Sequence, residues 1–252
     1  MPDITLVNVL FDGSFDGFCS IIHAHFYDKV AADYINEQSS FQETLGGSYK
    51  FITTDYEKSE KVFNAICEKI SPEAASTVYK AFLSDGKERF INIYRYILLG
   101  FKKGAEVDRY MKYDYVTYVQ KAARYVGGEA HLLTGFCRFT ETVSGVLYAP
   151  VGPVNNVLAI LAGHFSQRLM NEQWIIHDTK RHIAAVYDGN EFIISEVPDS
   201  VKVFSSSSEA EYRELWRSFF NTIAIENRKN KNLQRNNLPL RYRKHMTEFI
   251  LV

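Results

Sequence analysis

The sequence predicts an α+β fold in which an antiparallel sheet carries a packed helix and is flanked by a helical section and by a C-terminal helix with a basic tail. Aromatic and β-branched residues alternate with short polar breaks over residues 131–188, as is typical of strands. Residues 55–126 have apolar side chains at helical spacing. The 252 residues are 46% hydrophobic and 14% aromatic, which is enough for a sizeable core.

The first 54 residues predict a strand, a helix and a second strand. Ile4–Phe11 is an almost wholly apolar run that ends at a turn, so a buried strand is expected there. Ser14 or Asp16 can cap the helix that follows. The second strand is expected over Tyr49–Thr54.

Four helices are predicted between residues 55 and 126. Gly127 and Gly128 are expected to end the last of them, because glycine favours helix C-termini. We interpret residues 1–252 as a single domain with a subdivision at these glycines, into a mainly helical part (1–128) and a sheet-containing part with the basic tail (129–252). The predicted helices begin at Asp55, at Ser71, near Phe90, and at Val107 or Tyr113.

The sheet is predicted from four runs, and a helix is predicted between the second run and the third. Asn155 or Asn156 can cap this helix, one face of which should lie on the sheet. A further helix is predicted over Glu209–Ile225, with Trp216 expected in the core. The four predicted strands are Gly135–Thr140, Val146–Pro150, Trp174–Asp178 and His182–Tyr187.

Charge and cysteine content exclude several classes of protein. The formal net charge is −1, so no global field draws the chain to nucleic acid or to an anionic membrane. The three cysteines are far apart and form no CxxC pair, which argues against a disulfide framework or a zinc site. The sequence has no secretory pattern and no run of about 18 apolar residues. A cytoplasmic protein without a membrane partner is therefore expected.

The sequence contains no motif that dictates one reaction. It has no HExxH, no GxSxG and no glycine loop suited to phosphate. Asp12 and Asp16 are better explained by a turn and a helix cap than by metal binding. No metal and no cofactor are expected, and the sequence leaves open whether the chain is an enzyme.

A candidate site lies at the end of the third predicted strand. His177 and Asp178 suit general acid–base catalysis, with Asp178 orienting the imidazole, and the two following cations suit phosphate. Arg138, expected on a strand, and Arg168, expected at a helix end, suit bidentate phosphate contacts. The alternative is that His177 and Asp178 hold a turn while the arginines pair with carboxylates. The predicted nucleic-acid-binding residues of this region are His131, Arg138, His164, Arg168, Trp174, Lys180 and Arg181.

The tail differs from the rest of the chain. Residues 228–244 contain seven Lys or Arg, no acid, and several Asn and Gln. This composition is typical of a surface that contacts phosphates. A solvated basic loop that pairs with an acidic body is the alternative. The cations of the tail are Arg228, Lys229, Lys231, Arg235, Arg241, Arg243 and Lys244.

Several motifs occur in a fixed order over nearly the whole chain: FDGSFDGF, GFCRF, LYAPVGP, LAGHFSQRL, WIIHDTKRHIAAVYDG, LWRSFFNTIAIENRKN and LPLRYRKHM. This series resembles a bacterial family of DNA metabolism and DNA repair proteins built on a domain of undefined function. The resemblance implies a setting beside a radical-SAM protein of DNA modification or repair, and in some members a fusion to uracil-DNA glycosylase. The chain departs from the family where it has His131-Leu132, because many relatives have a His-Arg pair there.

Three hypotheses of function follow. The first, which we prefer, is a DNA-binding repair accessory that acts with the radical-SAM partner. The second is an enzyme that acts directly on a nucleic-acid base or phosphate, with His177 as the base. The third is a protein-interaction scaffold whose tail binds an acidic partner surface. The chain itself lacks the cysteine triplet that a radical-SAM cluster needs.

Overall fold

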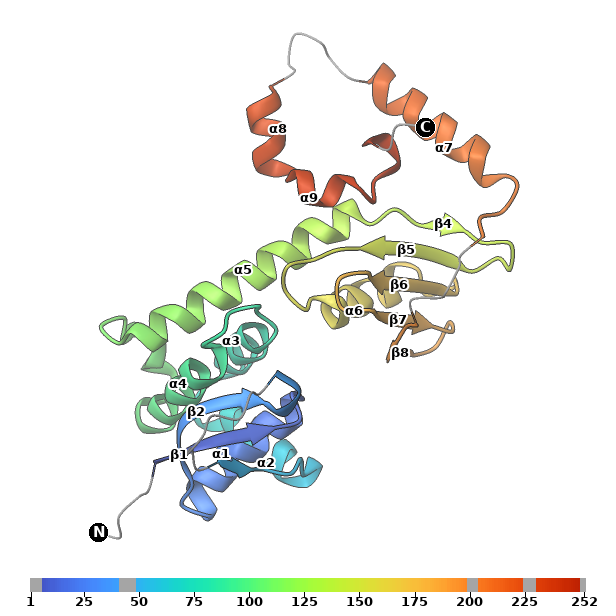
Figure 1. The fold of residues 1–252 in the computed structure, drawn as a ribbon. Helices are drawn as coiled ribbons and strands as arrows, with labels where there is room; N and C mark the ends of the chain where they lie inside the picture. Colours follow the sequence, from blue (N-terminus) through green and yellow to red (C-terminus); the bar gives the residue numbers. More distant parts are fainter. Residues whose placement is uncertain (1–5, 41–48, 199–203, 224–229, 250–252) are drawn as a thin grey trace. The chain divides into compact units, whose positions relative to one another are not determined.

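The computed structural model describes residues 6–40, 49–198, 204–223 and 230–249 (Figure 1). The chain forms two compact units, residues 1–127 and 128–252. Helix α5 (Asp114–Phe136) contributes residues to both. The described residues form nine α-helices and two sheets, of three and of five strands, so the fold is α+β as predicted.

A parallel three-stranded sheet is the centre of the N-terminal unit. Its order is β2 (Ala31–Glu37), β1 (Leu6–Phe11), β3 (Tyr49–Phe51). Helix α1 (Phe15–Tyr27) connects β1 to β2, and a helical crossover returns the chain to the same end of the sheet, which makes the two strands parallel. The strand predicted at residues 4–11 is confirmed for its described part. Strand β2 was not predicted.

Polar residues begin three helices of this unit where the sequence predicts caps. The side chains of Ser14, Asp55 and Ser71 each accept a hydrogen bond from a backbone N–H three residues on, at 2.9, 3.1 and 3.0 Å. Each cap satisfies an N–H that has no partner within the helix. The helices that follow are α1, α2 (Tyr56–Lys69) and α3 (Pro72–Phe82), and the next is α4 (Arg89–Lys103).

Asp12, which follows β1, is held by several hydrogen bonds. Its carboxylate accepts from the backbone N–H of Ser14 at 2.9 Å, the hydroxyl of Ser14 at 2.7 Å and the hydroxyl of Thr54 at 2.7 Å. Burial raises the pKa of Asp12, but these hydrogen bonds outweigh it and the pKa is lowered. Asp16 accepts from the hydroxyl of Ser59 at 2.5 Å. Both carboxylates therefore organise the turn and the neighbouring helices.

The prediction that Gly127 and Gly128 end a helix is wrong. Helix α5 continues through both glycines to Phe136. A glycine inside a helix costs only about 1 kcal/mol relative to alanine, and packing overrides that preference. Val126 and Leu133 are buried on either side of the pair. The first predicted strand is consequently reduced to β4 (Thr140–Glu141).

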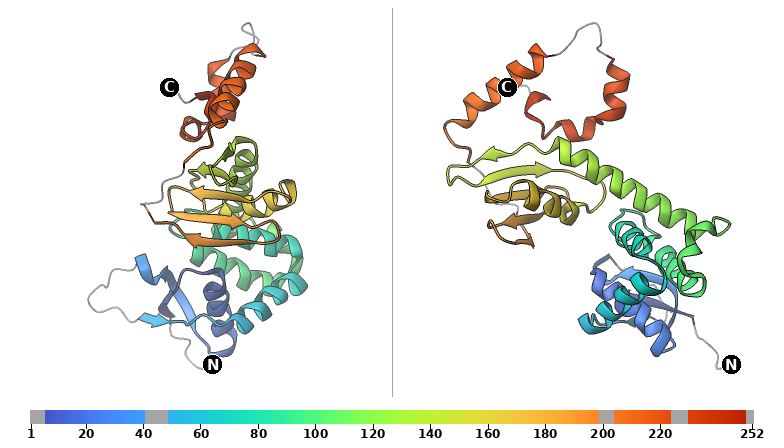
Figure 2. Two further views of the ribbon diagram at one scale, coloured as in Figure 1. Left: turned by 90° about the vertical axis from the view of Figure 1, so that its right-hand side faces the viewer. Right: turned by 180° about the vertical axis from the view of Figure 1, so that it is seen from behind.

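The C-terminal unit contains a mixed five-stranded sheet in the order β4-β5-β6-β7-β8 (Figures 1 and 2). The prediction of an antiparallel sheet is only partly right, because β5 and β6 are parallel while the other neighbours are antiparallel. The helix between β5 and β6 is the physical reason, as in the N-terminal unit. The strands after β4 are β5 (Leu147–Val151), β6 (Trp174–Asp178), β7 (Ile183–Tyr187) and β8 (Phe192–Glu196), of which β8 was not predicted.

Helix α6 (Leu158–Arg168) packs on one face of this sheet. Its buried residues include Leu161 and Phe165, as the helical spacing predicts. The residue before the helix is Val157, which makes no side-chain cap, so the predicted cap at Asn155 or Asn156 is wrong.

The last described part of the chain contains α7 (Glu209–Thr222), α8 (Lys231–Asn237) and α9 (Leu240–Arg243). Trp216 on α7 is 39% exposed, so its expected place in the core is wrong. Other apolar side chains of the same stripe are more exposed still. They are Tyr212, Leu215, Phe219 and Ile223, at 65, 65, 54 and 57%. Among the described helices, none combines the length and the apolar character needed to cross a bilayer.

The cap of α3 gives a stability test. Replacement Ser71→Ala removes the hydroxyl that accepts from the N–H of Ala74, so we expect α3 to lose about 1 kcal/mol. Hydrogen exchange of the α3 amides should become about fivefold faster. The control is Ser76→Ala on the same helix, because Ser76 is exposed and caps nothing. Equal exchange in the two variants would contradict the cap assignment.

Candidate functional site

Strands β5 and β6 bring Tyr148 and His177 together on one face of the sheet. Their parallel register pairs Tyr148 with Ile175 and Pro150 with His177, and side chains alternate along each strand. The hydroxyl of Tyr148 lies 2.7 Å from Nδ1 of His177. Both side chains are half-buried, whereas the opposite face is buried and carries α6. Tyr148 therefore orients the imidazole of His177.

The basic segment after α9 lies against the loop that follows β5. A Cβ atom at Gly152 would lie 3.3 Å from Nζ of Lys244 and 3.4 Å from Nε2 of His245. These distances are tighter than ordinary contacts, so the absence of a side chain at Gly152 permits the approach. Lys244 and His245 thus lie beside the end of β5, next to the strand that carries His177.

The imidazoles of His177 and His245 each have a buried, unsatisfied nitrogen. Neither Nε2 atom has a hydrogen-bond partner among the described residues. Burial lowers the pKa of His177. Burial, with the charges of Lys244 and His177, lowers the pKa of His245 to about 4. Both rings are therefore neutral at pH 7, and each offers one nitrogen that can donate or accept a hydrogen bond, depending on the tautomer.

Asp178 does not contact the ring of His177, because consecutive strand residues point to opposite faces. Its fully buried carboxylate accepts from the backbone N–H groups of Lys180 and Arg181, at 3.0 and 3.3 Å, and pairs with the Arg181 guanidinium at 3.0 Å. Tyr148, and not Asp178, thus has the orienting role that the sequence suggested. Asp178 holds the turn between β6 and β7.

The same turn holds the loop after β5. The Lys180 ammonium donates to the backbone carbonyl of Val154 at 3.3 Å, and the Arg181 guanidinium donates to the carbonyls of Pro153 and Val154. The side chains of both residues are thus positioned by the loop after β5.

Glu129 on α5 joins the loop to α9. Its carboxylate is buried and accepts from the backbone N–H groups of Val154 and Asn155, both at 2.8 Å, from the Asn155 amide at 2.6 Å, and from the Tyr242 hydroxyl. Burial and then the hydrogen bond to Glu129 raise the pKa of Tyr242 to about 12. Because Tyr242 immediately precedes Arg243 and Lys244, this contact fixes the position of the basic segment.

The segments that meet at this contact carry exposed cations and buried carboxylates. Lys180, Arg241 and Lys244 are exposed, whereas Glu129 and Asp178 are buried and satisfied. On α8, Lys231 and Arg235 are exposed as well. Arg243 is different, because it donates to the Leu238 carbonyl and lies over the Phe249 ring. Arg228 and Lys229 lie outside the described residues.

Arg138 lies after the end of α5 and not on a strand. Its guanidinium pairs with Glu248 at 2.7 Å and lies 5.3 Å from the centre of the Trp216 ring. Burial raises the pKa of Glu248, but the hydrogen bonds from Arg138 and Trp216 lower it overall. Glu248 is therefore charged and compensates Arg138, which leaves this arginine poorly suited to bind phosphate.

Four other predicted residues lie away from His177. Trp174 is fully buried and stacks on Tyr187, so its ring is not open to a base. His164 and Arg168 are exposed on α6, which covers the opposite face of the sheet. His131 is two residues beyond Glu129, about 200° around α5. The structure thus brings together His177, Lys180, Arg181 and Lys244, and separates the others from them.

Sequence reasoning missed Tyr148, Glu129, Gly152 and His245. Tyr148 and Gly152 are in LYAPVGP, and His245 is in LPLRYRKHM, two of the motifs that carry the family resemblance. Those motifs could have identified the three. Glu129 is in none of them. No group of three or more His, Cys, Asp or Glu side chains suited to a metal ion occurs in the described part of the chain.

Comparison with known proteins identifies a family. A family model described as "Domain of unknown function (DUF4130)" matches residues 87–248, which include every residue of the site. No curated protein and no solved structure matches the chain.

The low pKa of His245 gives a pH test. The unfolded chain takes up a proton near pH 6.5 and the folded chain only near pH 4, so the free energy of unfolding should fall as the pH drops between these values. We expect His245→Gln to reduce this fall between pH 7 and 5, measured by urea denaturation. His131→Gln, at an exposed position, is the control for the replacement of a histidine. Three parallel curves would show that His245 is not buried in the neutral form.

Proposed function

The chain belongs to the DUF4130 family, whose description assigns no activity, and we propose that it is a DNA-binding protein of DNA repair that acts together with a radical-SAM partner. The setting comes from the resemblance carried by the ordered motifs. The DNA-binding part is supported by one structural observation above all, the position of Lys244 and His245 over Gly152, beside the strand of His177.

The position of Lys244 beside Gly152 supports a role of the basic tail in phosphate binding. Lys180, Arg241 and Lys244 are exposed cations. The carboxylates of Glu129 and Asp178 are buried and already paired within the protein, so they do not offset these cations at the surface. Duplex DNA carries one negative charge per about 1.7 Å of its axis, so several phosphates lie within reach of such a face. The net charge of the whole chain is −1, so the attraction is local and should be strongly reduced by salt.

The neutral histidines add a group that cations lack. An imidazole nitrogen that is not protonated can accept or donate one directional hydrogen bond, to a base edge or to a phosphate oxygen. The Nε2 atoms of His177 and His245 have no hydrogen-bond partner among the described residues, and because both are buried, a nucleotide would contact them only after neighbouring side chains move aside.

The partner is supported by α7. Tyr212, Leu215 and Phe219 on α7, and Ile223 directly after it, leave half or more of their side chains exposed. Contiguous exposed apolar side chains mark surfaces that bind other proteins. We assign this stripe to the radical-SAM partner.

A second candidate function, an enzyme that acts on a nucleic-acid base or phosphate, is favoured by the contact between Tyr148 and His177. If Nδ1 of His177 donates to the Tyr148 oxygen, Nε2 is left as a free base.

The DNA-binding proposal is tested by salt dependence. We expect the full chain to bind DNA, and we expect Arg241→Gln with Lys244→Gln to lower the slope of log K against log salt by about 2, one for each phosphate contact. Arg168→Gln is the matched control, because Arg168 is an exposed arginine on the helix behind the sheet. Single-stranded, duplex and uracil-containing DNA should each be measured by fluorescence anisotropy. Absence of salt-sensitive binding to all three forms would refute the proposal.

The enzyme alternative is tested with His177. If the alternative holds, His177→Gln abolishes turnover of DNA by the purified chain and leaves DNA affinity within about twofold. Tyr148→Phe keeps the ring but removes the hydroxyl that orients His177, and should reduce turnover less. Wild-type protein without any turnover, alone and with the radical-SAM partner, would eliminate this alternative.

A further inference from the structure

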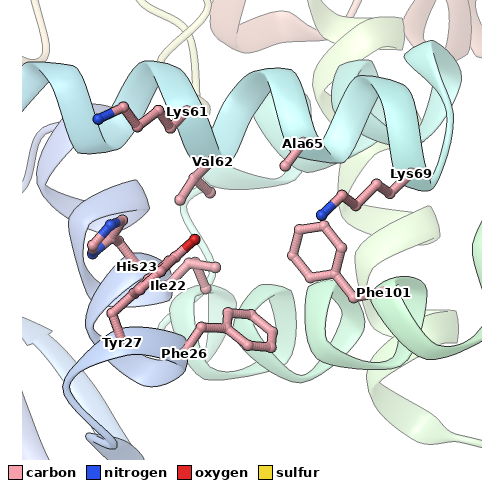
Figure 3. Close-up of a pocket in the computed structure, with 9 residues that line it drawn as sticks. All are labelled: Ile22, His23, Phe26, Tyr27, Lys61, Val62, Ala65, Lys69 and Phe101. Atoms are coloured by element: carbon pink, nitrogen blue, oxygen red, sulfur yellow. The ribbon is translucent and has the colours of Figure 1, made fainter.

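A cavity of about 280 Å³ lies between helices α1, α2 and α4 of the N-terminal unit (Figure 3). Eight of its nine lining residues precede residue 87, where the family match begins, and the ninth is Phe101. Most of the cavity therefore lies outside the family match, and all of its lining residues lie outside the site in the other unit.

Aromatic rings form much of its wall. Phe26 packs edge-on against Phe101, with ring centres 5.4 Å apart. His23 stacks on Tyr27 at 4.2 Å, with an angle of 15° between the rings. Phe26 is 50% and Tyr27 74% exposed, although aromatic rings gain most when they are covered. Figure 3 shows that Val62 on α2 faces these rings across the cavity. A flat ring placed here would cover apolar surface that water now contacts.

The charged side chains that line the cavity are all positive. Lys61 and Lys69 line it from α2, and none of the nine lining residues is acidic. The side chain of neither lysine forms an ion pair or hydrogen bond with any residue that the structure describes. The Cα atoms of the two lysines are eight residues apart on α2, which is about 12 Å along the helix axis, so the two side chains start from different ends of the cavity. The buried Nδ1 atom of His23 also has no hydrogen-bond partner among the described residues.

We propose that this cavity binds a small planar aromatic anion. Its ring lies among His23, Tyr27 and Phe26, and its carboxylate or phosphate pairs with Lys61 or Lys69. The volume is near the lower end of the range of small-molecule sites, about 300–1,000 Å³, which restricts the ligand to one ring or a fused pair. A neutral ring would leave the lysines unused, and an anion without a ring would leave the aromatic wall uncovered. The proposal does not depend on DNA binding by the other unit.

The ligand could be a nucleotide or an aromatic carboxylate, and titration with one compound of each class distinguishes the two. The full chain is titrated by calorimetry with dTMP, a mononucleotide, and with indole-3-acetate, an aromatic carboxylate. Thymidine and indole-3-acetamide are the matched uncharged compounds. We expect at least one anion to bind ten or more times more tightly than its uncharged partner. Binding of dTMP alone assigns the cavity to nucleotides, and binding of indole-3-acetate alone assigns it to carboxylates.

Variants locate the binding in this cavity. The double variant Lys61→Gln with Lys69→Gln should weaken the anion about tenfold and leave the uncharged partner unchanged. Lys58→Gln is the control, because Lys58 is on the same helix, outside the cavity, and paired with Asp55. Ala65→Phe should fill the cavity and weaken both compounds, with folding checked by circular dichroism.

The proposal is overturned if neither anion binds at millimolar concentration. It is also overturned if an anion binds equally well to wild type and to the double lysine variant. The exposed lysine positions keep the test decisive even if Ala65→Phe does not fold. Lys244→Gln, in the other unit, should leave this binding unchanged.

Discussion

The buried carboxylate of Glu129 is the contact on which the C-terminal site depends. A carboxylate removed from water is costly unless hydrogen bonds replace its hydration, and Glu129 obtains them from the loop after β5 and from Tyr242. Those partners are 25 and 113 residues distant in sequence. One charge therefore connects α5, the loop and α9. The approach of Lys244 to Gly152 follows from this connection, and with it the joining of the basic segment to the strand of His177.

The sequence predicts those elements of the fold that depend on local preference. The caps at Ser14, Asp55 and Ser71 and the apolar strand β1 are visible in a few consecutive residues. Strand β2 was missed because AADYINE is neither continuously apolar nor strictly alternating. The course of α5 through two glycines was missed because burial on both sides decides it. The parallel pairing of β5 and β6 could have been predicted, because a helix between two neighbouring strands makes them parallel and this helix was predicted.

The proximity of candidate residues could be predicted where they are neighbours in sequence. His177, Lys180 and Arg181 are brought together by one strand and its turn, so their proximity could be predicted. Their partners could not, because Tyr148 depends on strand register and His245 on the path of the C-terminal segment. The alternation of side chains along β6 also explains why Trp174 and Asp178 do not lie beside the ring of His177. Trp174 and Asp178 have the opposite parity to His177, so both point to the buried side.

The turn after β1 is poorly suited to bind a phosphate. Where a parallel strand is followed by a helix, many nucleotide-binding proteins seat a phosphate on the free N–H groups at the helix start. Here the carboxylate of Asp12 lies at the start of α1, where it accepts from the N–H of Ser14, and a Cβ atom at Gly17 would lie only 2.3 Å from its Oδ1. The negative charge of Asp12 therefore disfavours the binding of a phosphate at the start of α1. We expect ligands of this unit to bind elsewhere on its surface.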